Sequence, residues 1–231
     1  MFPLDELIEA AHALSRLGLV TAFGHVSVRD GTSMLITPAA DLGTVTAQDI
    51  VRVPLDATAL PARTPAEAWV HLALYRTRPD CAAIARAQPP STFAAAASIT
   101  SACVTALVPT YGQAAWLGES VPVHDSALLL RSPELADQAA RGLASGEALL
   151  LRGNGAITLG ATPGTAAARM WLLSAACTAY LAAPAAAPLT VAEIASWRAV
   201  RDELLPRLWQ HLRSSRTSGG PRQQALLPAG D

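Results

Sequence analysis

A lone amide interrupts one of the most apolar stretches of the chain. The segment LLLRGNGAITLG, residues 149–160, is predicted to form two strands joined by a turn, with Asn154 at the tip. Glycine and asparagine tolerate positive φ, so Gly153-Asn154-Gly155 suits a turn on conformational grounds alone. A carboxamide at this place has a chemical role only if other polar residues converge on it, and the rest of the chain decides that.

The chain contains no lysine, since all 17 of its basic residues are arginine. A Schiff base with a side-chain amine is therefore excluded, and so are lysine-anchored pyridoxal phosphate and a P-loop lysine. Any carbonyl chemistry must use other groups.

The chain has 231 residues, of which 51% are apolar, and a net charge of −1, which is enough for one large globular domain with a hydrophobic core. This balance gives no reason to expect a nucleic acid or a membrane as partner. The three cysteines have no metal-binding spacing and are expected to be reduced thiols. The start is acidic where a signal peptide would be basic, and the apolar run 170–183 is too short to span a bilayer. We therefore expect a cytoplasmic protein.

The elements that must position any site follow from periodicity and capping signals. Thr64-Pro65-Ala66-Glu67 looks like a capping box with proline at the first helical position, which predicts a helix from there to Arg78. A second box at Thr190 predicts a last helix to about residue 212. Further helices are expected over 4–17, 91–98, 132–144 and 162–183, and strands over 25–29, 34–36, 51–56 and 81–86 besides the hairpin.

These elements lack a regular βαβ rhythm, which favours a layered α/β domain with much antiparallel pairing. We expect residues 1–212 to form one domain. Residues 213–231 are polar and rich in glycine and proline, and are predicted to be a flexible tail.

Four stretches in this order resemble the class II aldolase/adducin family. They are GLVTAFGHVSVRD with MLITP (18–38), EAWVHLALYRTRPD (67–80), AAIARAQPPSTFAAAAS (82–98) and LLLRGNGAITLGATPGTAAARMWLLSAAC (149–177). The resemblance implies an α/β/α sandwich around a mixed, mostly antiparallel central sheet. It also implies a homo-oligomer, usually a tetramer, with sites between subunits.

The family's metal-dependent members place a divalent metal on three histidines, two in an H-x-H-P sequence and one in an H-G turn, beside a glutamate acid/base. By resemblance, Glu67 keeps the glutamate, and His71, expected to bind substrate, keeps the histidine one helical turn later. The three metal ligands, however, correspond to Arg86, Gln88 and Asn154.

These replacements change the chemistry. A guanidinium has no lone pair to give and repels a dication, so we expect no metal, with zinc or manganese as the fallback. A cation flanked by two carboxamides has the ingredients of an oxyanion hole, so we hypothesise that Arg86, Gln88 and Asn154 stabilise an enolate-like anion in the metal's place. The structural alternatives are a helix cap for Glu67 and a plain ion pair for Arg86.

The end of the site that would hold phosphate also departs from the family. Gly24-His25 replaces Gly-Asn, the loop 37–41 offers Thr37 but ends in two alanines and Asp41, and Pro65-Ala66 replaces paired serines. Asp41 would repel a phosphate dianion and alanine offers it no donor. His25, in a mouth with aromatic residues such as Trp116, instead fits a non-phosphorylated, planar carboxylate.

The segment 109–125 is expected to cover the site, with Tyr111 and His124 as further acid/base candidates. The sequence as a whole predicts a carbon–carbon lyase, with decarboxylation of a hydroxylated aromatic or oxo carboxylic acid favoured. Aldol cleavage, isomerisation or dehydration of a small oxo or hydroxy acid is an alternative. A non-catalytic, adducin-like interaction protein is another.

Overall fold

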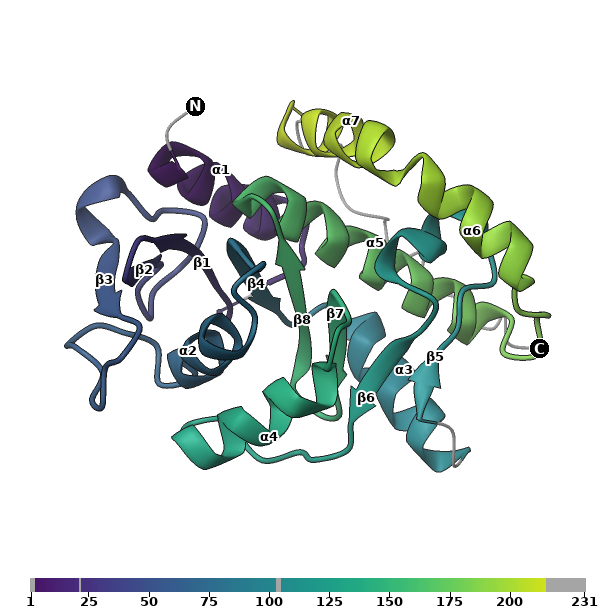
Figure 1. Cartoon of the computed structure of the whole chain (residues 1–231), viewed down its shortest axis with the longest axis horizontal. Coiled ribbons are helices and arrows are strands. Elements are labelled where there is room, and N and C mark those ends of the chain that lie inside the picture. The colour runs from purple at the N-terminus through teal and green to yellow at the C-terminus, as the bar shows by residue number, and fades with distance from the viewer. Residues whose placement is uncertain (1–2, 21, 103–104, 215–231) are drawn as a thin grey trace, which may run out of the picture.

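The computed structural model describes residues 3–20, 22–102 and 105–214, and within them eight strands form one sheet (Figure 1). The order across the sheet is β3-β2-β1-β4-β8-β7-β6-β5. The strands are β1 His25–Asp30, β2 Ser33–Ile36, β3 Val51–Pro54, β4 Ala83–Ala87, β5 Ala106–Leu107, β6 Val121–His124, β7 Ala148–Leu151 and β8 Gly155–Gly160.

Neighbouring strands pair antiparallel except β6 and β7, which are parallel. The helices are α1 Pro3–Arg16, α2 Ala68–Thr77, α3 Pro90–Ser101, α4 Pro133–Leu143, α5 Pro163–Ala182, α6 Val191–Ala199 and α7 Arg201–Ser214, with 3₁₀ turns η1 Ala47–Asp49 and η2 Gly112–Leu117. The mixed, mostly antiparallel sheet between helical layers confirms the predicted fold class.

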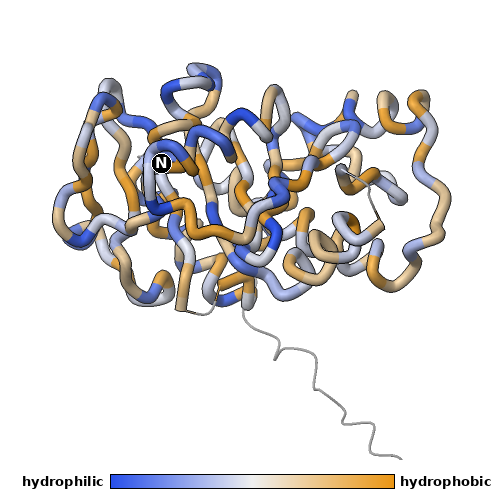
Figure 2. The backbone as a smooth tube through the Cα atoms, turned by 90° about the horizontal axis from the view of Figure 1, so that it is seen from below, coloured by the Kyte–Doolittle hydropathy of each residue, from blue (hydrophilic) through white to orange (hydrophobic). Residues whose placement is uncertain are grey.

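Helices cover both faces of the sheet, and each face has its own hydrophobic core (Figure 1). On the face called here the α5 face, α1, α3 and α5 pack on the strands and α7 packs on α5 and α1. On the opposite side, the α2 face, α2 packs beside α4. Hydrophobic and hydrophilic residues alternate along much of the chain (Figure 2), as expected for elements with one buried side.

The central strands β1 and β4 carry small apolar residues toward the α5 face and, apart from Ile84, polar ones toward the α2 face. Val26 and Val28 belong to the α5-face core, whereas His25 and Ser27 alternate with them and point the other way. His25 lies directly opposite Arg86 of β4. The pleat therefore brings three buried polar side chains to one face of the sheet.

The hairpin between β7 and β8 brings Asn154 to the end of β4 because of one glycine. Gly155 has φ +87°, and a Cβ there would lie 2.2 Å from the Ala87 carbonyl oxygen and 2.9 Å from the Gln88 Cα. No side chain fits at this distance, so the two strands meet backbone to backbone. The turn prediction is confirmed, and its close approach places the amide of Asn154 beside Gln88.

The predicted capping box at the start of α2 is wrong. The helix begins at Ala68, after a turn that includes the Ala68 N–H to Pro65 carbonyl bond, and Thr64 Oγ1 is buried without a hydrogen-bond partner among the described residues. Glu67 precedes the helix and makes no cap bond. Its carboxylate has stronger partners on the sheet, described below.

The last helix is two helices, although a single one was predicted. The Thr190 capping box forms, but α6 ends at Ala199 and α7 starts at Arg201. The buried residues Ile194 and Leu205 stay in helical phase across the break, so apolar spacing alone could not reveal it. Most of the predicted tail, residues 215–231, lies outside the described residues, as does Cys103.

No helix in the described part of the chain has the length and apolar character needed to cross a bilayer.

Candidate active site

A buried ion pair between Arg86 of β4 and Glu67, ahead of α2, forms the centre of the site. Arg86 Nη2 lies 2.7 Å from Glu67 Oε2, and the two side chains are 2% and 13% exposed. The other carboxylate oxygen, Oε1, accepts from Asn154 Nδ2 at 2.8 Å and from the Leu130 N–H at 3.2 Å. Burial lowers the pKa of Arg86, and the Glu67 charge opposes that shift. Three segments distant in sequence thus converge on the carboxylate of Glu67.

Two carboxamides complete the cluster. Asn154, 3% exposed, accepts a short hydrogen bond from Arg86 Nη2 through Oδ1. The Gln88 amide group donates to the same Asn154 oxygen at 3.1 Å, and turned over it accepts from both terminal nitrogens of Arg86 at 3.1 Å. The structure therefore brings together Glu67, Arg86, Gln88 and Asn154, the four residues that the resemblance placed at the reaction centre.

A series of buried polar groups leads from this cluster into the core. His25 Nε2 lies 4.0 Å from Glu67 Oε2, and His25 Nδ1 lies 2.7 Å from His71 Nε2. His71 Nδ1 is 2.6 Å from Ser27 Oγ, which is 2.8 Å from the Tyr75 hydroxyl. His71 and Tyr75 are one turn apart on α2 and so share its sheet-facing side.

Both histidines of this series are neutral. Burial, with the positive charge of Arg86, lowers the pKa of His71 to about 3. Burial, with the neighbouring His71 and the positive charge of Arg86, lowers the pKa of His25 well below its usual value. Burial raises the pKa of the Tyr75 hydroxyl, which stays protonated.

The ion pair borders a cavity of about 240 Å³. Arg131 lines its mouth, is exposed, and makes no ion pair within the described part of the chain. A carboxylate, a neutral histidine and two guanidinium groups therefore face one small space. The full lining is Ala22, Phe23, Gly24, His25, Ala39, Ala40, Pro65, Ala66, Glu67, Arg86 and Arg131.

Only some of the residues expected at the phosphate end of the site line the cavity. His25 lines the cavity, and so do the alanines of the 37–41 loop. Thr37 does not line it, because its hydroxyl accepts from the Val26 N–H inside the sheet. Asp41 is not in the lining either, and its carboxylate accepts from the Gly43 N–H. His71, predicted to bind substrate, is fully buried behind His25.

The segment 109–125, predicted to cover the site, does not line the cavity of this chain. Trp116 is buried in the α5-face core and donates from Nε1 to the Trp197 carbonyl. Tyr111 packs against the same core with its hydroxyl buried and unbonded to any described residue. His124 ends β6, two strands away from β8, where burial lowers its pKa. These three side chains are outside the cavity lining.

Sequence reasoning did not single out Ser27, Tyr75 or Arg131. The first two had a usable signal: polar residues at alternate positions 25 and 27 with valines at 26 and 28, and a histidine and tyrosine four residues apart on an apolar helix. Arg131 had none, because a single arginine in a loop is an ordinary surface residue.

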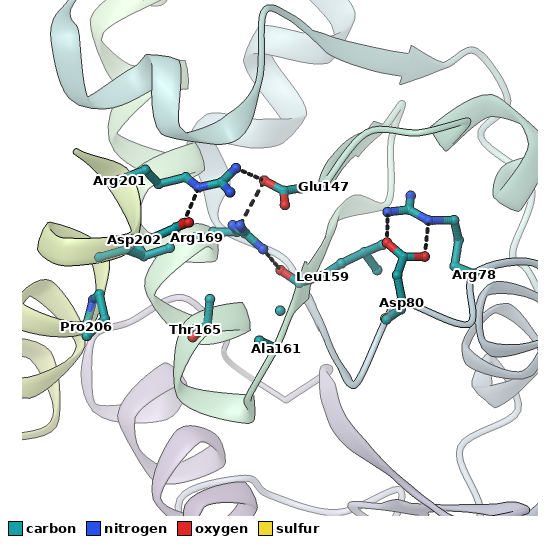
Figure 3. Close-up of a pocket in the computed structure, with 13 residues that line it drawn as sticks. Arg78, Asp80, Glu147, Leu159, Ala161, Thr165, Arg169, Arg201, Asp202 and Pro206 are labelled. Atoms are coloured by element: carbon teal, nitrogen blue, oxygen red, sulfur yellow. Dashed lines mark hydrogen bonds and ion pairs between the residues drawn. The ribbon is translucent and has the colours of Figure 1, made fainter. Parts of the chain in front are cut away.

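A second, larger cavity of about 400 Å³ lies near α5, β8 and α7 and is also rich in charge (Figure 3). Glu147 accepts from both Arg169 at 2.8 Å and Arg201 at 3.0 Å. Arg169 also donates to the Leu159 carbonyl at 2.7 Å, and Arg201 pairs with Asp202. Every arginine drawn there has a carboxylate partner, so this cavity offers no free cation for a ligand.

The site's donor set does not suit the divalent metal that the family resemblance implies. Arg86 offers no lone pair and carries a positive charge, and Asn154 Oδ1 already accepts from it. Across the described residues, no group of three or more His, Cys, Asp or Glu side chains is arranged to hold a metal ion. The chemistry of this site is therefore derived from side chains alone.

The description "Class II Aldolase and Adducin N-terminal domain" belongs to the family model that matches residues 5–181, which is most of the chain. The chain belongs to this family. No curated protein matches it at a significant level.

Solved structures of class II aldolases are similar to it over most of their length. The chain is 24% identical to YgbL from Escherichia coli, a putative aldolase/epimerase/decarboxylase, with TM-score 0.72 over 84% of this chain and 97% of that one. An L-fuculose 1-phosphate aldolase is 24% identical, with TM-score 0.75 over 85% and 94%. The L-fuculose-1-phosphate aldolase of Thermus thermophilus is 26% identical, with TM-score 0.68 over 80% and 97%. Together with the family match, these similarities show that the chain has the fold of this family.

Proposed function

We propose that this class II aldolase-family member is a carbon–carbon lyase, and that its substrate is a small, non-phosphorylated oxo or hydroxylated aromatic carboxylic acid. Decarboxylation is the favoured reaction. The observation that carries the proposal is the shared cavity in which Glu67, Arg86 and Arg131 meet, the last without an ion-pair partner among the described residues.

Arg131 supports a carboxylate as the group that is recognised. An exposed guanidinium that no described carboxylate engages can bind a ligand carboxylate through paired N–H groups. The rest of the lining at this end is small and apolar, with alanine at 39, 40 and 66, and supplies no hydroxyl groups for a phosphate dianion. Two of the similar structures are named for a sugar phosphate, and this difference in lining separates the chain from them.

Arg86 supports an anionic intermediate. Its bonds to Glu67 and Asn154 both use Nη2, and Arg86 lines the cavity. When the C–C bond to the carboxylate breaks, CO₂ leaves and the bonding electron pair moves onto the neighbouring carbonyl or ring oxygen. Arg86 stabilises the negative charge that forms on that oxygen, with the amides of Gln88 and Asn154 holding it in position.

Glu67 supports the proton transfer that completes the reaction. Its carboxylate reaches the cavity while bound at both oxygens, so it stays at a fixed position beside the reacting carbon. The Glu67 carboxylate takes up one proton from water, gives it to the carbanion carbon and returns to its ionised form paired with Arg86, so the reaction consumes one proton overall. Aldol cleavage, isomerisation and dehydration pass through a similar enolate, so the same four residues serve them equally.

A homo-oligomer is part of the proposal. Phe23 at the cavity mouth is 67% exposed, and Leu128 and Leu129, in the loop that carries Arg131, are 61% and 48% exposed. A second subunit that covers these apolar side chains would close the open side of the site. Light scattering of the purified protein measures the oligomeric state, and a monomer would remove this part of the proposal.

The central test is CO₂ release from a panel of 3-oxo acids and hydroxybenzoates, with Arg86→Gln as the matched inactive protein. We expect turnover of at least one acid by the native protein only. Elemental analysis should find well under one equivalent of zinc, manganese or iron, and chelators should leave the rate unchanged. Stoichiometric metal with chelator-sensitive activity would overturn the role given to Arg86. No CO₂ release from any acid, with protein NMR spectra that are identical with and without each acid, would favour a non-catalytic interaction protein.

A further inference from the structure

The four buried groups behind the cavity form one continuous hydrogen-bonded chain, and its protons can be counted. From the cavity inward the order is His25, His71, Ser27 and Tyr75, with links of 2.7, 2.6 and 2.8 Å. All four side chains are at most 4% exposed. Each link needs one donor and one acceptor. An order in which both His71 and Tyr75 donate to Ser27 would leave the Ser27 proton buried without an acceptor, so two proton orders remain, in which Ser27 donates either to Tyr75 or to His71.

Tyr75 decides between these two orders. Its hydroxyl is protonated and has Ser27 Oγ as its one hydrogen-bond partner among the described residues. If Ser27 donated to Tyr75, the tyrosine proton would be buried without an acceptor, which costs about 1–3 kcal/mol. Tyr75 therefore donates to Ser27, and the Ser27 proton goes to His71 Nδ1.

The remaining protons follow from this step. A neutral His71 with an unprotonated Nδ1 carries its proton on Nε2, which donates to His25 Nδ1. A neutral His25 that accepts at Nδ1 in turn carries its proton on Nε2. That nitrogen faces the cavity and Glu67 Oε2, 4.0 Å away.

We propose that Ser27 is a positioning residue that fixes His25 in its Nε2–H tautomer, so that His25 is a neutral hydrogen-bond donor to the ligand in the cavity and not a base. The charged or titratable groups that face His25 are His71, Glu67 and Arg86. The part of the inference that concerns a ligand oxygen as acceptor rests on the proposed function. The proton order itself does not.

The tautomer is measured directly by long-range ¹H–¹⁵N correlation NMR of the ¹⁵N-labelled native protein at pH 7, with His25 assigned by loss of its signals in His25→Asn. We expect Nε2 to be protonated and Nδ1 unprotonated in both His25 and His71. A proton on His25 Nδ1, or on both of its nitrogens, would overturn the proposal. This measurement needs no substrate and no variant in the hydrogen-bonded chain beyond the one used for assignment.

Two single-hydroxyl variants then separate the roles. In Ser27→Ala the link is lost, so both tautomers of His25 become populated and kcat/KM falls about tenfold, the value of one good hydrogen bond. In Tyr75→Phe the Ser27 proton still has His71 Nδ1 as its acceptor, so His25 stays Nε2–H and kcat/KM stays within about twofold. An unchanged His25 tautomer in folded Ser27→Ala would refute the role of Ser27.

The proton order and the lyase activity are tested by different measurements. The expected tautomer in a protein that turns over none of the tested acids would disprove the proposed lyase and leave the proton order standing. A lyase with the wrong tautomer would do the reverse. If Ser27→Ala does not fold, the native spectrum and Tyr75→Phe decide the matter between them.

Discussion

Two buried arginine–glutamate pairs, Arg86–Glu67 and Arg169–Glu147, have nearly the same geometry and very different surroundings. Their N···O distances are 2.7 and 2.8 Å, and their arginine side chains are 2% and 7% exposed. Glu147 is shared by a second arginine, and Arg169 is capped by a backbone carbonyl. Glu67 is held instead by one side-chain amide and one backbone N–H, and faces a cavity whose outer guanidinium has no carboxylate partner in the described part of the chain.

This difference separates a structural pair from a candidate catalytic one better than burial does. Arg169 joins β8, α5 and the segment before β7, so its partners are those that a link between elements requires. The pair of Arg86 needs neither Asn154 nor Gln88 for structural cohesion, yet both amides are aimed at it. Polar side chains gathered around a charge that is already paired indicate that the charge has a further use.

The largest expected effect is on catalysis, and it should fall on one pair only. Removal of one oxyanion donor typically costs about 10²–10³ in rate, so we expect Arg86→Gln to lower kcat at least that far. Arg169→Gln, the matched control, should keep kcat within about threefold. Steady-state kinetics on the same acid compares them, and equal losses in the two variants would erase the distinction between the pairs.

Substitution of the arginine in either pair should lower the free energy of unfolding by a similar amount. Each single substitution leaves a largely buried carboxylate with fewer partners, at a cost of about 1–3 kcal/mol in the free energy of unfolding. The double variants Arg86→Gln/Glu67→Gln and Arg169→Gln/Glu147→Gln should recover much of that loss, because no unpaired charge remains. Urea unfolding measures this. Recovery of activity as well as stability in Arg86→Gln/Glu67→Gln would show that the first pair is structural after all.

Acid should lower the free energy of unfolding through the buried histidines near Arg86. The pair of Arg169 and Glu147 has no such histidine among its contacts in the described residues. His71 has a pKa of about 3 in the folded chain, and a histidine has one near 6.5 when unfolded, so the unfolded state binds the extra proton between these values. This contribution to stability is complete above pH 6.5 and falls by about 1.4 kcal/mol per pH unit below it. Unfolding curves between pH 7 and 5 should therefore be steeper in pH for the native protein than for His71→Asn. Parallel curves would mean that His71 is not neutral when folded.

The smallest expected effect is that of Arg131, the exposed guanidinium in the lining of the cavity beside the Arg86–Glu67 pair. Arg131→Gln should raise KM about fivefold with little change in kcat, because exposed ion pairs contribute at most about 1 kcal/mol. Arg141→Gln, on the exposed side of α4, is the matched control and should change neither constant. A loss in kcat without a change in KM for Arg131→Gln would move Arg131 from binding to catalysis.

Much of the framework was predictable from local patterns. The helices predicted to begin at 132 and 162, which Ser132 and Thr162 cap, and the hairpin at 153–155 formed as expected, because a helix start or a tight turn depends on a few adjacent residues. The capping box at Thr64 failed although its sequence is equally suitable. Glu67 found a cation and an amide on the sheet, and these long-range partners outweigh a surface cap.

The sequence by itself determined which chemistry is available. The absence of lysine excludes an imine, and arginine and two amides at positions 86, 88 and 154 give hydrogen-bond donors where histidines would hold a metal. Only the tertiary structure decided which of these groups meet. The pleat puts His25 and Ser27 on the face that α2 covers, and the packing of the η2 turn places Trp116 in the opposite core. Sequence periodicity tells which residues share a face, but the partner that packs on that face is chosen by long-range contacts, because those bury the most surface and satisfy the buried charges.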